Sequence, residues 1–237
     1  MIIQLDVKSL EIVAAGFLSQ DKVLREELIN KVDIHGNNQK AFDLPTRLIA
    51  KTLVFRILYG GSAFAFVKDP TFASVKGTEK YWQNVIDKFY QKYPGIKQWH
   101  SNIIKEATLT GRVVIPTGRF FPFHPKNGDY PITQIKNYPV QALGADLVSI
   151  IRVNFYNRFK SLSKYYGCDV GFMVSSVHDS IVVDSPSKEL QIIAKTMHRS
   201  VTDCPRLFEE RFGIKFNVPM TAEIKYGPNQ EDMVEWN

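Results

Sequence analysis

Apolar and polar residues recur with two different periods along the chain, and these periods predict its strands and helices. Helical spacing is found in six segments: 10–19, 21–31, 46–59, 78–109 with a break at Pro94 and Gly95, 133–163, and 187–203. Apolar, β-branched or turn-bounded runs predict strands in four places: 1–7, the hairpin 111–123, 170–177, and 180–184. The residues after 203 are predicted to be irregular.

The order of these elements indicates the fold class. Strands lie near both ends of the chain with helices between them, which favours an α+β fold over a doubly wound parallel sheet. The 237 residues, 44% of them hydrophobic, suffice for one large domain or two closely joined ones. No repeat, low-complexity tract or Gly/Ser linker interrupts them.

Composition changes this picture only slightly. The net charge of +6 is consistent with a polyanionic partner and equally with an ordinary solvated surface. Cys168 and Cys204 are too few for a disulfide framework and lack zinc-site spacing, so we expect free thiols. Without a signal peptide or membrane span, the chain is expected to be soluble and cytoplasmic.

The stretch VHDSIVVD places Asp179 inside an apolar, β-branched run. A carboxylate removed from water needs compensation. Three arrangements would supply it: a tight turn at His178 and Asp179 that keeps the carboxylate hydrated, a salt bridge to a neighbouring strand, or a bound divalent metal. The octapeptide alone favours the first two, because acidic turns between strands are common.

Asp6 is likewise a carboxylate in an apolar run, at the end of the strand that begins Ile2, Ile3. If the two strands are neighbours, both carboxylates can share one site. Mg²⁺ prefers such oxygen ligands, and two Mg²⁺ ions can clamp the attacking and leaving oxygens of a phosphoryl transfer. The pair Asp6 and Asp179 therefore predicts a site for two magnesium ions.

Residues spaced four apart form a stripe along the helix after Thr46: Arg47, Lys51, Phe55 and Tyr59. On an arbitrary helix this would more often be a basic solvated face with aromatic residues turned into the core. A nucleoside triphosphate offers the same order of parts, a polyphosphate for the cations and a flat base for the rings. His35 is either a further phosphate donor or simply a turn residue.

Asn137 and Gln141 lie one helical turn apart in NYPVQALGAD. Their amides suit the acceptors that every base pair presents in the minor groove, although a capping role is at least as common. Contact of this kind would not read the DNA sequence.

The quoted segments occur in an order that resembles family A DNA polymerases, of the DNA polymerase I and T-odd phage replicase type. The resemblance is carried by five stretches: LDVKSLEIVAAGFLS, DIHGNNQKAF, LPTRLIAKTLVFRILYG, NYPVQALGAD and VHDS. It implies a polymerase palm and fingers without thumb or exonuclease domain. Palm residues are then 1–20 and 131–237, and fingers residues are 21–130.

The resemblance also implies roles for single residues. Asp6 and Asp179, with the Val7 carbonyl, would bind the metals, and Glu11 would exclude a 2′-hydroxyl from the incoming sugar. The triphosphate would be bound by Arg47, Lys51 and His35, and Lys51 would also be catalytic. Phe55 and Tyr59 would lie beside the incoming nucleotide. The primer-template end would be contacted by Asn137, Gln141 and His178.

Several positions depart from the family pattern and bear on rate and DNA affinity rather than reaction type. They are Val7, Lys8, Ser9 and Val13 in the first motif, Arg56 and Ala142 at frequent glycines, Thr133 where arginine is common, and Ser180 in place of a glutamate.

Two function classes follow from the resemblance. The first is template-directed transfer of deoxynucleotides (dNTPs) to a primer, with a second polypeptide supplying thumb, exonuclease and the rest of the palm, because Met1 lies only five residues before Asp6. The second is an inactive remnant that binds DNA or a replisome partner. The retained charges favour catalysis.

Overall fold

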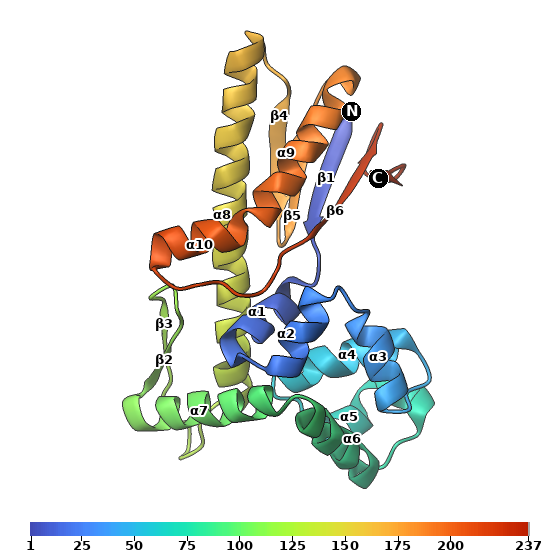
Figure 1. The fold of residues 1–237 in the computed structure, drawn as a ribbon. Helices are drawn as coiled ribbons and strands as arrows, with labels where there is room; N and C mark the ends of the chain where they lie inside the picture. Colours follow the sequence, from blue (N-terminus) through green and yellow to red (C-terminus); the bar gives the residue numbers. More distant parts are fainter. Residues whose placement is uncertain (237) are drawn as a thin grey trace. The chain divides into compact units, whose positions relative to one another are not determined.

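The computed structural model describes residues 1–236, which form two compact units (Figure 1). Unit 1 is Met1–Val13 with the described part of Ala142–Asn237, and unit 2 is Ala14–Gln141. Two helices have residues in both units: α1 (Leu10–Ser19) and α8 (Ile132–Tyr166).

Unit 1 is built on five strands and the helices that follow them: β1 (Ile2–Val7), β4 (Phe172–Val177), β5 (Ser180–Asp184), η2 (Ser187–Glu189), α9 (Leu190–Thr202), α10 (Cys204–Phe212), β6 (Ala222–Gly227) and β7 (Val234–Glu235). Unit 2 is mostly helical: α2 (Lys22–Ile29), α3 (Ile34–Ala41), α4 (Arg47–Leu58), α5 (Ala63–Lys68), η1 (Pro70–Val75), α6 (Glu79–Lys92), α7 (Pro94–Thr110), β2 (Arg112–Val114) and β3 (Phe120–Pro122). The architecture is α+β, as predicted.

The sheet of unit 1 is antiparallel and has the strand order β4-β5-β1-β6-β7. Its central strand β1 alternates strictly: Ile3, Leu5 and Val7 are buried, whereas Gln4 and Asp6 are partly exposed. Because side chains alternate between the faces of a strand, one face is apolar and the other polar. Helix α9 packs against β1 and β6 and lies along the sheet in Figure 1.

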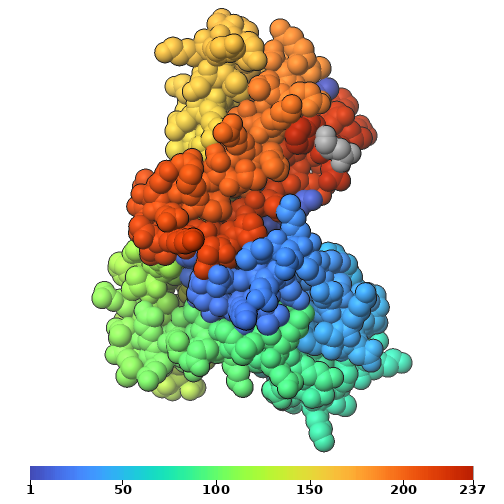
Figure 2. Space-filling model, viewed as in Figure 1, coloured from blue at the N-terminus to red at the C-terminus, as the bar shows by residue number. Residues whose placement is uncertain are grey.

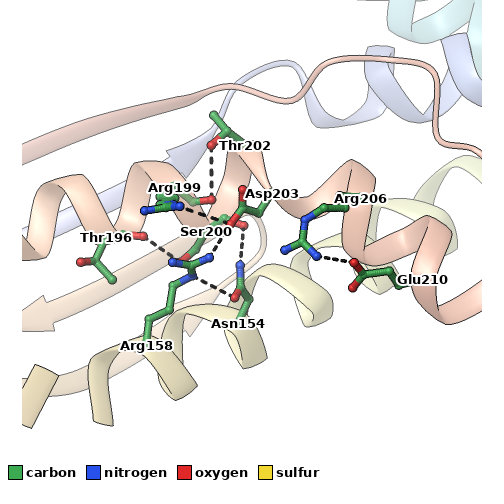
Figure 3. A network of polar contacts seen from close by, with 9 residues as sticks. All are labelled: Asn154, Arg158, Thr196, Arg199, Ser200, Thr202, Asp203, Arg206 and Glu210. Carbon is green, nitrogen blue, oxygen red and sulfur yellow. Dashed lines mark hydrogen bonds and ion pairs between the residues drawn. The ribbon is translucent and has the colours of Figure 1, made fainter. Parts of the chain in front are cut away.

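A network of polar contacts ties α8 to the junction of α9 and α10 (Figure 3). The Arg158 guanidinium donates to the Asp203 carboxylate and to Asn154 Oδ1, and Asn154 Nδ2 donates to the Ser200 carbonyl. Both charged side chains of the Arg158–Asp203 pair are largely shielded from solvent, with exposed fractions of 30% and 24%. The network fixes α8 beside α9, and α9 and α10 present a continuous surface (orange to red in Figure 2).

Aromatic side chains fill the core of unit 2. Trp82 and Phe89 are buried, and Trp82 contacts the rings of Phe66 and Phe72. Helix α4 begins where the Thr46 hydroxyl accepts a hydrogen bond from the Ile49 amide, the usual side-chain cap. The buried residues of α4 turn one face of the helix into this core, so its stripe of charged and aromatic residues lies on the remaining face.

Most predicted elements are present, but the prediction of an irregular end after residue 203 is wrong. Helix α10 follows α9 directly, and β6 pairs with β1 along its whole length. Helix α3 was also not expected, because its sequence IHGNNQKA contains poor helix formers. Cys168 and Cys204 are free, as predicted. Within residues 1–236 no helix is long and apolar enough to cross a membrane.

Candidate active site

Asp6 and Asp179 lie next to each other in unit 1, because β1 pairs with β5. Asp6 is opposite Ser180 in the antiparallel register, and the Val7 amide donates a 3.1 Å hydrogen bond to the Asp179 carbonyl. Neighbouring strands are about 4.8 Å apart, so two acids separated by 172 positions of sequence come into the same small region. Asp179 is partly exposed in the turn between β4 and β5, and no ion pair of the described residues involves it.

The partners of Asp6 on the polar face of the sheet were not anticipated from sequence. Gln4 Nε2 donates to both carboxylate oxygens of Asp6, at 3.2 and 3.0 Å. On the other side, Glu223 of β6 is opposite Asp6 in register. The strict alternation of AEIKY is the sequence signal that could have identified this strand and its glutamate.

Glu223 is already neutralised by cations. It forms ion pairs with Lys225 at 2.9 Å and with Lys8 at 3.8 Å. The hydrogen bond from Lys225, followed by the attraction of both lysines, lowers the pKa of Glu223 despite its partial burial. Asp6 therefore has a third carboxylate beside it, but one whose charge the lysines balance.

The oxygen donors at this end of β1 fit a hard divalent cation, although they are few. Among the residues that the structure describes, no three His, Cys, Asp or Glu side chains group into a metal cluster. Asp6 and Asp179 offer carboxylate oxygens only, the donor type that Mg²⁺ prefers. Mg²⁺ commonly binds one or two carboxylates and completes its shell with water and substrate phosphate, and the two acids match that number and type of protein ligand.

The remaining predicted residues of unit 1 lie near the ends of β1, α1 and β5. Glu11 is in the first turn of α1, partly exposed. His178 is exposed in the turn before β5, with a left-handed backbone (φ 53°). The Val7 amide is the group that bonds to Asp179.

The stripe predicted on α4 is continuous in unit 2. Phe55 and Tyr59 stack with ring centroids 6.4 Å apart and planes inclined by 25°. The Lys51 ammonium lies 5.9 Å from the Phe55 centroid. At the far end, Gln141 Nε2 donates a 2.6 Å hydrogen bond to the Tyr59 hydroxyl, so α8 joins the ridge. We call Arg47, Lys51, Phe55 and Tyr59 the α4 ridge.

Arg47 is held by an acid that sequence reasoning did not single out. Its Nε and terminal nitrogen donate to both carboxylate oxygens of Asp33, at 2.9 and 2.8 Å. This bidentate pair lowers the pKa of Asp33 to about 2 and raises that of Arg47. Both side chains are more than half exposed, so the pair is open to exchange with another anion.

His35 lies within the same group. Its ring centroid is 5.8 Å from that of Phe55, and the residue is 7% exposed. Burial, and next the positive charges of Arg47 and Lys51, lower its pKa to about 4. His35 is therefore neutral at pH 7 and can donate one hydrogen bond. Its Nδ1 is buried without a partner among the described residues.

Asn137 Oδ1 is likewise buried and has no hydrogen-bond partner within residues 1–236. Gln141, one turn further along α8, is exposed and bonded to Tyr59. The structure thus groups the predicted residues in two sets: Asp6, Val7, Glu11, His178 and Asp179 in unit 1, and His35, Arg47, Lys51, Phe55, Tyr59, Asn137 and Gln141 in unit 2.

Comparison with known proteins identifies the family. The model of DNA polymerase family A matches residues 1–232. The chain belongs to DNA polymerase family A. The family A assignment agrees with the resemblance of the five sequence motifs.

Curated relatives include DNA polymerase I of Caldicellulosiruptor bescii, 23% identical over 97% of this chain and 26% of the relative, and the thermostable DNA polymerase I of Thermus aquaticus, 24% identical over 82% and 24%. The chain thus spans about a quarter of their length. Among solved structures, the POL domain of Pol1 from M. smegmatis, in complex with DNA primer-template and dNTP, has a TM-score of 0.77 at 17% identity, covering 95% of this chain and 39% of that one. This neighbour shows that the two share a fold.

Proposed function

We propose that this chain carries the active-site portion of a family A DNA polymerase and performs template-directed transfer of deoxynucleotides to a primer 3′-hydroxyl. The observation that carries the proposal is the β1–β5 pairing, which brings Asp6 of β1 close to Asp179 in the turn that leads into β5. In this proposal residues 1–20 and 131–237 form the palm, and residues 21–130 form the fingers.

The α4 ridge is proposed to bind the incoming nucleotide. Lys51 and Arg47 would bind the triphosphate and stabilise charge moving onto the pyrophosphate, while neutral His35 would donate one hydrogen bond. Phe55 would stack on the nucleotide, with Tyr59 beside the nascent base pair. Since Arg47 is paired with Asp33, nucleotide binding is expected to compete for its guanidinium.

Contacts to the sugar and to DNA complete the proposal. Glu11 would exclude a 2′-hydroxyl, and His178, Asn137 and Gln141 would contact the primer-template end. The buried, unpartnered Asn137 Oδ1 supports this role, because an acceptor left without a donor costs free energy that a DNA amino group would recover.

Asp6 and Asp179, with the Val7 carbonyl, would hold two Mg²⁺ ions. When bound, these ions supply the lowered pKa of the primer hydroxyl and stabilisation of charge on the transferring phosphoryl group. The chain's own contribution is to hold Asp6 on β1, where Gln4 orients its carboxylate, and Asp179 in the turn whose carbonyl is bonded to the Val7 amide.

Primer extension tests the proposal. We expect extension in the presence of Mg²⁺ by the chain, alone or with its partner, and a loss of at least about a thousandfold for Asp179→Ala, since such a change removes charge stabilisation from the transition state. Asp184→Ala, at the other end of β5, is the matched control and should retain activity. Extension that persists unchanged in Asp179→Ala would refute the metal assignment.

We further propose that a second polypeptide supplies thumb, exonuclease domain and the remaining palm. Within residues 1–236, β4 is an edge of the sheet, with Phe172, Val174 and Val177 each more than half exposed. Exposed apolar edge strands favour pairing with another chain. Co-expression with the candidate partner should give a stable complex, and a well-folded monomer that ignores this partner would contradict the proposal.

An inactive DNA-binding or replisome-scaffolding protein is the second candidate. Its supporting observation is the engagement of Arg47 by Asp33 together with Ser180, a hydroxyl, opposite Asp6. DNA binding without any extension, both with and without the partner chain, would favour this candidate.

A further inference from the structure

A lysine on α8 lies beside the α4 ridge and takes no part in the roles above. Lys136 is half-buried, and its side-chain stem packs on the turn after α4. A Cβ added at Gly60 would approach Lys136 Cδ to 3.0 Å, and Gly60 has a left-handed φ of 85°. Glycine at position 60 therefore leaves the space through which the lysine stem passes.

This lysine has no counter-ion among the described residues. Among residues 1–236 no carboxylate lies within ion-pair distance of its ammonium and no acceptor within hydrogen-bond distance, and burial lowers its pKa. His100 is near enough to be affected, but burial, followed by the charge of Lys136, lowers the pKa of His100 to about 3, so His100 is neutral. A partly desolvated cation without a partner is costly.

A lysine stem can cover apolar surface while its ammonium reaches water, and that alone would explain one such residue. Here, however, the next residue, Asn137, also has a buried polar atom without a partner in the part of the chain that the structure describes. Tyr59, which adjoins Gly60, is bonded to Gln141 of the same helix. Two successive residues of α8, near the turn after α4, thus carry a cation and a buried acceptor that have no partner within residues 1–236.

We propose that Lys136 binds a backbone phosphate of bound DNA at this corner of α4 and α8. The inference rests on the proposed DNA-polymerase function. An ammonium supplies the charge that a phosphodiester lacks, and nucleic-acid phosphates are the commonest contacts that fix a protein's register on DNA. Such a contact carries no base specificity, so it would add affinity to all sequences equally.

Salt-dependent DNA binding tests this role. Binding of the full chain to a labelled primer-template would be followed by fluorescence anisotropy for the unchanged protein, Lys136→Met and Lys136→Gln. Loss of one phosphate contact should reduce the slope of log affinity against log salt by about 0.9. The ratio of the DNA affinity of the unchanged protein to that of either variant should then fall about threefold to fourfold between 50 and 200 mM salt.

Controls separate the inference from the function on which it rests. Lys88→Met removes an exposed lysine of α6 and should leave the slope unchanged. Lys136→Met should also melt no lower than the unchanged protein, since it removes an uncompensated charge and keeps the stem volume. If the unchanged protein binds DNA and both Lys136 variants keep its affinity and slope, the phosphate contact is refuted. If the unchanged protein binds no DNA, the proposed function fails instead.

Discussion

Gln141 Nε2 lies 2.6 Å from the hydroxyl oxygen of Tyr59 and donates a hydrogen bond to it. The bond joins the last residue of unit 2 on α8 to the residue that caps α4. Because Tyr59 stacks on Phe55, the amide of Gln141 helps to set the orientation of the aromatic end of the α4 ridge.

Removing this bond should lower the free energy of unfolding only slightly and should weaken nucleotide binding more clearly. The bond is exposed, so the coupling between Tyr59→Phe and Gln141→Ala in a double-mutant cycle of urea unfolding is expected to be about 0.5 to 1 kcal/mol. Both variants should raise the KM for dNTP more than they lower kcat. Strictly additive effects on stability and KM would show that the two side chains act separately.

Asp33→Asn should release Arg47 for the triphosphate. An exposed pair is worth at most about 1 kcal/mol, so dNTP affinity in an equilibrium binding measurement should rise by up to about fivefold. Asp69→Asn is the matched control, because Asp69 forms a similar pair with Arg56 at 2.7 Å. An unchanged or weakened dNTP affinity in Asp33→Asn would argue against competition for Arg47.

The same pair predicts a pH dependence of stability. The pKa of Asp33 is lowered from its ordinary 3.8 to about 2 by the hydrogen bonds from Arg47. A group whose pKa is lowered by folding stabilises the folded state above its ordinary pKa, and loses that contribution as the pH falls through the folded value. The unfolding midpoints of the protein and Asp33→Asn should therefore differ above pH 4 and converge toward pH 2.

Glu223→Gln should weaken the binding of Mg²⁺ at the site. The variant frees Lys8 and Lys225 from their common partner, and the charge of Lys225 already acts on Asp6. Released cations beside Asp6 should raise the Mg²⁺ concentration for half-maximal primer extension by severalfold, with stability little changed. Glu189→Gln, which also breaks an ion pair with a neighbouring lysine, should leave the Mg²⁺ requirement as it is.

The Arg158–Asp203 pair is predicted to matter for stability alone. Its side chains are mostly shielded and share a network with Asn154, so Asp203→Ala, which leaves Arg158 unpaired, should reduce the free energy of urea unfolding by about 2 to 3 kcal/mol. Arg206→Ala breaks only an exposed pair with Glu210, and about 0.5 kcal/mol or less is expected. Equal losses in the two variants would show that the network adds nothing.

The sequence was sufficient for the elements whose pattern is local. Asp6 and Asp179 were recognisable because a charge in an apolar strand needs compensation, and the α4 ridge because its residues are spaced four apart. The structure adds that Asp179 lies in the turn before β5, next to the end of β1 that carries Asp6, and that the ridge ends on Gln141. Their roles in binding metal and nucleotide stay predictions.

Other features could not be found because they depend on distant or ordinary residues. Asp33 reaches Arg47 across a loop, a contact that no helical spacing encodes. Glu223 belongs to β6, a short strand that follows several irregular residues and has its role only through pairing with β1. Lys136 resembles any lysine of an amphipathic helix until the absence of a counter-ion within residues 1–236 is known.

The position of β1 between β5 and β6 limits which mutations this protein can accept during evolution. Since successive side chains of a strand point to opposite faces, a slip of one residue would bury Asp6 among apolar side chains and expose Leu5 and Val7. Many substitutions on the helices can be absorbed by repacking. An inserted or deleted residue within β1 cannot be absorbed in this way. Over evolution, the number of residues in this strand should therefore change less often than the identity of most residues around it.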